Sequence, residues 1–133
     1  MNRMASIAAT SSILVIGFIA LADAQLQLPK AMKGNSNYQG RVNSPWSLVI
    51  DKMHSDGAFE GTVTYEGRQC SALRNPTKNG VVTGDEIRFN VWMGPQCSEN
   101  TFVLQRGKSH FLEGELRSNV APDKAQVWLD PDS

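Results

Sequence analysis

Two carboxylates whose spacing could support chemistry are Glu113 and Glu115, in a segment (110–117) where apolar and polar residues alternate. On a β-strand this spacing places both side chains on one face, about 6.6 Å apart. That separation falls in the range of the acid and base of inverting glycosidases. A general acid, however, requires a pocket that raises its pKa, and an outward strand face shared with Arg117 supplies none. We therefore interpret the pair as part of a solvated face and predict no catalytic residue.

Metal and cofactor chemistry has little support in the residue pattern. His54 and His110 are the two histidines, and His54 precedes Asp56 in a turn. These groups could bind a metal ion only if the fold brought them together. The chain has two cysteines without a CxxC or a nearby His pair, and it lacks HExxH, GxSxG, Walker-type and GxGxxG motifs. We predict no metal, no cofactor and no enzymatic activity.

The tryptophans are the most informative side chains for binding. Trp92 and Trp128 fall on outward-facing positions of their expected strands, whereas Trp46 begins a strand and is expected to pack into one barrel end. An exposed indole is a large apolar plate with a polar N–H, which suits protein interfaces and flat ligands. Arg88 and Asn90 share a face with Trp92 and could add polar contacts. The alternative is that a bulge, or the segment 25–45, buries Trp92 and Trp128.

The first 24 residues have the layout of a secretory signal peptide. Arg3 is followed by an uncharged stretch (5–22) and by Ala22-Asp23-Ala24, which fits the small-x-small cleavage rule. The alternative is an uncleaved membrane anchor, but the densest apolar run covers only residues 13–22, whereas a span needs about 20 residues. We expect an exported protein, periplasmic or secreted, without membrane contact after cleavage.

Export would expose both cysteines to an oxidising compartment, where thiols pair. Cys70–Cys97 is the only intramolecular choice. The closed loop, of 28 residues counting both cysteines, corresponds to about 3.6 kcal/mol in the chain-entropy model. The alternative is two free thiols in a reducing compartment.

The fold class follows from turns and alternation. Turn signals rich in Gly, Pro, Asn and Asp recur after residue 46 and separate runs rich in β-branched and aromatic residues. Runs such as 59–65 and 87–93 alternate with period two. We predict an all-β domain at 46–133, preceded by an extended, partly mobile lead-in at 25–45. The predicted strands are 46–53, 58–66, 68–73, 86–93, 100–106, 110–117 and 124–129, with 80–83 as a candidate eighth.

A small antiparallel meander barrel of seven to eight strands accounts for this pattern better than an open β-sandwich, because closure removes exposed sheet edges. Trp46-x-Leu48-x-Ile50, followed by the segment 56–62 (DGAFEGT), resembles the first two strands of avidin-like barrels. The resemblance implies the barrel fold. It does not imply biotin binding, because residues 47–51 do not match the Asn and Gly-Ser pair that hold biotin in those families.

The balance of acidic and basic residues limits the classes of partner that we expect. Thirteen Lys and Arg balance thirteen Asp and Glu, which argues against nucleic-acid binding. We expect a non-enzymatic binding module that interacts with, or inhibits, another exported protein through Trp92 and Trp128. The alternative is a small-ligand barrel, and a hydrolase is the least favoured hypothesis. The internal ligand would be held by Phe59, Tyr65, Phe89 and Trp46.

Overall fold

The computed structural model describes residues 25–38, 41–42, 44–68, 70–119 and 124–132. Over these residues the chain forms one antiparallel sheet, and no helix in this part of the chain is long and apolar enough to cross a membrane. The expected signal peptide lies outside the described residues. The strands are β1 (Ala31–Tyr38), β2 (Arg41–Val42), β3 (Trp46–Met53), β4 (Ala58–Glu66), β5 (Ser71–Pro76), β6 (Lys78–Thr83), β7 (Glu86–Trp92), β8 (Glu99–Arg106), β9 (Leu112–Ser118) and β10 (Lys124–Pro131).

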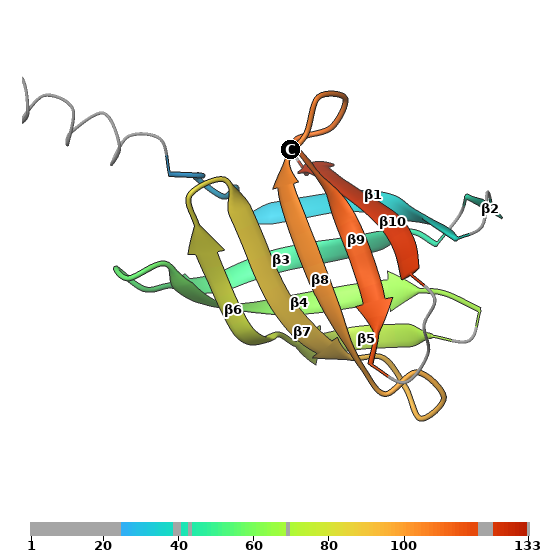
Figure 1. Ribbon diagram of the computed structural model, residues 1–133. Helices are drawn as coiled ribbons and strands as arrows, with labels where there is room; N and C mark the ends of the chain where they lie inside the picture. The colour runs from blue at the N-terminus through green and yellow to red at the C-terminus, as the bar shows by residue number, and fades with distance from the viewer. Residues whose placement is uncertain (1–24, 39–40, 43, 69, 120–123, 133) are drawn as a thin grey trace, which may run out of the picture.

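The sheet closes on itself as a barrel (Figure 1). Its strand order is β10-β9-β8-β7-β6-β4-β3-β1, and β10 pairs back with β1 from Met32↔Pro131 to Asn37↔Gln126. Eight strands therefore make the barrel, while β2 extends the β1 edge and β5 pairs with the second half of β4. The predicted all-β meander barrel is confirmed, and the open sandwich is wrong because the two end strands are hydrogen-bonded to each other.

Strand positions agree with the sequence pattern where the alternation is long. β3 and β4 have the predicted bounds, β7 to β10 lie within about two residues of theirs, and the candidate strand at 80–83 is the end of β6. The segment predicted at 68–73 is displaced to Ser71–Pro76 (β5). The connection between β4 and β5 includes Cys70, whose sulfur is bonded to Cys97, and β5 begins at the next residue.

The barrel begins before residue 46. β1 lies inside the segment interpreted as a lead-in, and it pairs with β3 on one side and β10 on the other. Its sequence, AMKGNSNY, is poor in β-branched residues, so its strand conformation depends on the two neighbouring strands and not on propensity. Met32 and Ser36 of β1 point into the barrel and are buried.

Aromatic side chains fill the interior. Phe89 and Phe102 stack with ring centroids 4.8 Å apart, and Trp46 lies at 4.8 Å from Phe102. Phe59 meets Phe89 edge-on at 6.0 Å, and Tyr65 meets Phe102 edge-on at 6.4 Å. The four residues expected to hold an internal ligand therefore pack against one another, directly or through Phe102.

The predicted disulfide is confirmed. Cys70 and Cys97 are bonded, with their Cα atoms 5.5 Å apart, and the chain has no free cysteine. The bond ties the connection between β4 and β5 to the turn between β7 and β8. A structural disulfide of this kind is typical of proteins in an oxidising environment.

Candidate functional site

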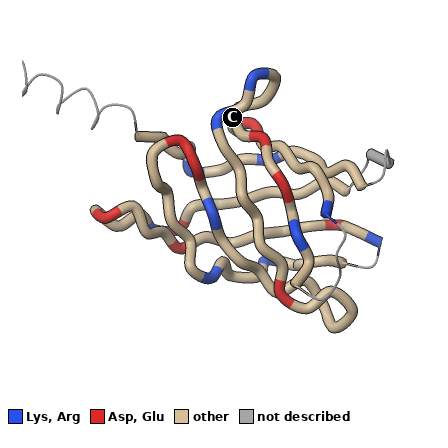
Figure 2. The backbone as a smooth tube through the Cα atoms, viewed as in Figure 1, with Lys and Arg blue, Asp and Glu red and all other residues tan. Residues whose placement is uncertain are grey.

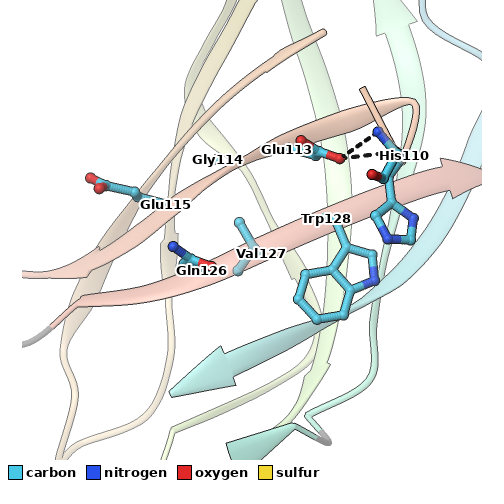
Figure 3. A pocket seen from close by; sticks show the side chains of 8 residues that line it. His110, Glu113, Gly114, Glu115, Gln126, Val127 and Trp128 are labelled. Carbon is cyan, nitrogen blue, oxygen red and sulfur yellow. Dashed lines mark hydrogen bonds between the residues drawn. The ribbon is translucent and has the colours of Figure 1, made fainter. Parts of the chain in front are cut away.

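The outer face of β9 and β10 carries a hollow of about 530 Å³, here called the Trp128 hollow. Glu113, Glu115, Gln126 and Trp128 point outward from these strands, and they alternate with the buried residues Leu112, Leu116, Val127 and Leu129. The loop between β8 and β9 forms one end of the hollow (Figure 3). Its lining is Ser109, His110, Glu113, Gly114, Glu115, Gln126, Val127 and Trp128.

Two carboxylates fix the loop beside the hollow. Glu113 Oε2 accepts hydrogen bonds from the backbone N–H groups of Ser109 (3.0 Å) and His110 (2.9 Å), as Figure 3 shows. Asp130 Oδ1 accepts the Phe111 N–H at 2.9 Å. The consecutive backbone N–H groups of the loop, which would otherwise need water, are thus bonded to carboxylates of β9 and β10. These hydrogen bonds hold the loop against the two strands.

His110 forms part of an aromatic pair. Its ring lies 5.3 Å from the Trp128 ring at an interplanar angle of 21°. Its Nδ1 is 2.7 Å from Asp130 Oδ2, so the carboxylate orients the imidazole. Trp128 is half-buried on β10 opposite Glu113 of β9 and Asn35 of β1. The predicted outward position of Trp128 is therefore observed, with one neighbouring ring stacked on it.

The carboxylates of this region are held in their charged form. Backbone N–H groups of Ser109 and His110 keep the pKa of Glu113 below its ordinary value of 4.5. Hydrogen bonds from Arg117, followed by Lys124, lower the pKa of Glu115. The Phe111 N–H and then His110 lower the pKa of Asp130. A general acid in a glycosidase needs the opposite shift, so Glu113 and Glu115 are suited to accepting hydrogen bonds and attracting cations.

Trp92 occupies a second exposed surface, which we call the Trp92 patch and which comprises Trp92, Leu73, Arg88 and Asn90. Trp92 is 47% exposed at the end of β7, and Leu73 of β5 is 75% exposed. The two strands lie side by side here, because Asn75 Nδ2 donates to the Trp92 carbonyl at 2.8 Å and the Ser71 N–H donates to the Met93 carbonyl at 3.2 Å. The outward position predicted for Trp92 is observed.

Arg88 and Asn90 lie in the same outward row of β7 as Trp92. Arg88 is exposed and lies 3.7 Å from Glu86, and Asn90 is half-buried opposite Thr101. In the view of Figure 2, acidic and basic residues are interspersed over the strands without a large area of one sign. Any recognition by this surface therefore depends on individual side chains and not on a broad electrostatic field.

The remaining predicted site residues, Trp46 and Tyr65, lie opposite each other on β3 and β4 and apart from these outer surfaces. Trp46 and Tyr65 are 2% and 5% exposed and belong to the core. The Trp46 indole N–H donates to the Asn35 carbonyl at 3.2 Å, and the Tyr65 hydroxyl is hydrogen-bonded to Ser36 Oγ at 2.6 Å. Both polar groups are thus satisfied within the barrel wall.

Trp92 and Trp128 do not share one face. In the ladders, Trp128 lies opposite Glu113, Glu113 opposite Gln105, and Gln105 opposite Glu86. Trp92 is six residues further along β7 than Glu86, which corresponds to about 20 Å. The two indoles therefore mark two distinct surfaces.

No family model, curated protein or solved structure matches this chain.

Ser109, Gln126 and Asp130 were not predicted from the sequence, and His110 was considered there only as a possible metal ligand. Their association depends on the β9–β10 register and on the loop conformation, neither of which the sequence specifies. The usable signal was Asp130, which lies two residues after Trp128 and so on the same strand face. Within the described ranges, no group of three His, Cys, Asp or Glu side chains is arranged to hold a metal ion.

Proposed function

We propose that this protein is an exported, non-enzymatic binding module that recognises another exported protein through the outside of its barrel. The N-terminal sequence pattern and the disulfide support export. The observation that carries the interaction role is the exposure of Trp92 on β7 and of Leu73 on β5, two strands that hydrogen bonds hold side by side. Tryptophan is enriched among the residues that dominate binding energy at protein interfaces.

The packing of the interior favours the outer surface over an internal ligand. Trp46, Phe59, Tyr65 and Phe89 are buried and contact other rings of the aromatic cluster. A ligand inside the barrel would have to displace these contacts, and closely packed protein interiors resist such insertion. The outer surfaces require no such rearrangement.

We propose that this protein resembles avidin-like barrels in its architecture alone. The Trp46 strand and the Phe59 strand are neighbours, as the motif implies. Residues 47–51 lack the biotin-site pattern, so we propose no biotin binding.

A capture experiment tests the interaction role. The oxidised protein is immobilised as the wild type, as Trp92→Ala and as Met53→Ala, and each is exposed to the exported proteins of its own source. We expect wild type and Met53→Ala to retain the same partner equally, and Trp92→Ala to retain at least about tenfold less. Met53 is the matched control because it is 46% exposed on another strand.

Circular dichroism and urea unfolding establish that each variant is folded. Equal retention of every bound protein by Trp92→Ala and the wild type would refute the assignment of the Trp92 patch as the interaction surface.

A further inference from the structure

The Trp128 hollow combines negative charge with aromatic surface. Glu113 and Glu115 line it from β9, Trp128 lines it from β10, and no Lys or Arg is among its lining residues. A concave site of this composition attracts a cation, because the carboxylates supply charge and the indole face supplies the negative end of its quadrupole.

Of the two carboxylates in the hollow, Glu113 is the one that remains available to bind a cation. Glu115 is already paired with Arg117 at 3.0 Å and with Lys124 at 3.4 Å. In the described part of the chain, Glu113 has no ion pair with a Lys or Arg side chain, and its Oε2 accepts hydrogen bonds from two backbone N–H groups. The imidazole of His110 is directed to Asp130 through Nδ1. Among the described residues that line the hollow, no Lys or Arg side chain neutralises the charge of Glu113.

The geometry is fixed before any ligand arrives. The backbone of the β8–β9 loop holds Glu113, and the stacked His110 holds Trp128. Asp130 holds His110 in turn. Binding to groups that are already ordered avoids much of the entropic cost of association.

We propose that the Trp128 hollow binds the guanidinium group of an arginine side chain on the partner protein. A guanidinium is planar, so it stacks on an indole while its N–H groups reach a neighbouring carboxylate. Trp128 and Glu113 occupy directly opposed positions on β10 and β9, and both line the hollow. This inference rests on the proposed interaction role and names the partner's contacting group.

The test uses two small probes, N-acetyl-L-arginine amide and N-acetyl-L-citrulline amide, which have nearly the same shape but differ in charge. Binding is followed in the oxidised protein by the NMR signals of the Trp128 indole N–H and of the Ser109 and His110 amides. We expect saturable shifts with the arginine probe, weakened by added salt, and at least about tenfold weaker binding of the citrulline probe.

Variants locate the contact. Glu113→Gln is expected to weaken binding of the arginine probe at least about tenfold. Glu60 is an exposed glutamate on β4 that pairs with His54, and Glu60→Gln is expected to leave binding unchanged. Because Glu113→Gln also alters the loop contacts, Trp128→Phe provides a second test that keeps Glu113 and is expected to weaken binding through the smaller ring. Equal binding of both probes, or unchanged binding of the arginine probe in both Glu113→Gln and Trp128→Phe, would overturn the proposal.

Failure here is separable from failure of the interaction role. If the arginine probe does not bind but Trp92→Ala still loses the captured partner, the hollow is wrongly assigned and the interaction role stands. If the arginine probe binds the hollow but no exported protein is retained by the wild type, the proposed interaction role is wrong.

Discussion

Alanine at position 34 is expected to lower the free energy of unfolding by about 3 kcal/mol. A Cβ atom on Gly34 would lie 1.8 Å from the carbonyl oxygen of Trp128 and 3.0 Å from the Cα atom of Leu129. Both neighbours are backbone atoms of β10, so neither can turn away as a side chain would. Gly34 lies where β1 and β10 close the barrel, and the substitution forces that closure apart.

Gly84→Ala is the control that tests whether the loss of stability in Gly34→Ala has a steric origin. Gly84 has a φ of +61°, but a Cβ there meets no atom within 4 Å. Its replacement should therefore cost only the backbone strain of about 1 kcal/mol. Urea unfolding monitored by tryptophan fluorescence compares the two variants, and a smaller loss in Gly34→Ala than in Gly84→Ala would show that the close approach is not a constraint.

Removal of the disulfide is the second substitution with a large expected effect. The double variant Cys70→Ala/Cys97→Ala should lose about 3.6 kcal/mol of unfolding free energy, because the reduced unfolded chain regains the freedom of the loop between the two positions. Cys97 is buried, so the loss of its packed sulfur adds to the entropic effect. For a domain of this size the melting temperature should fall by about 15 to 25 °C.

The measurement compares the oxidised wild type, the reduced wild type and the double variant in thermal and urea unfolding. The reduced wild type should lose about 3.6 kcal/mol, and the double variant should lose more, because only the double variant also lacks the buried sulfur of Cys97. A difference below about 1 kcal/mol between oxidised and reduced protein would contradict a stabilising role for the bond.

The sequence predicts the fold best where local pattern and final environment agree. β3 and β4 have alternating apolar residues and end at glycine-containing turns, so their bounds match the prediction. β1 could not be found this way, because its inward row includes Gly34, which the approach of β10 requires, and the polar Ser36. Within β5, Arg74 adopts a positive φ of 58°, an irregularity that a period-two pattern does not predict.

The sequence also predicted the part of the candidate surfaces that depends on local pattern. Period two correctly gave the outward positions of Trp92 and Trp128, because alternation is a property of a single strand. The contacts of His110 with Asp130 and Trp128 involve residues about 20 positions apart. Such contacts depend on register and loop shape, which a single sequence leaves open.

A partner that binds outside a filled barrel must perturb outer indoles and leave the inner one unchanged. The three indole N–H signals in an NMR spectrum report this directly, since Trp46 is buried with its N–H bonded to Asn35, while Trp92 and Trp128 lie on the outer face. On addition of the captured partner we predict that the Trp92 signal shifts, the Trp128 signal shifts if its hollow is used, and the Trp46 signal stays in place. A shift of the Trp46 signal with an unchanged Trp92 signal would mean that binding occurs inside the barrel.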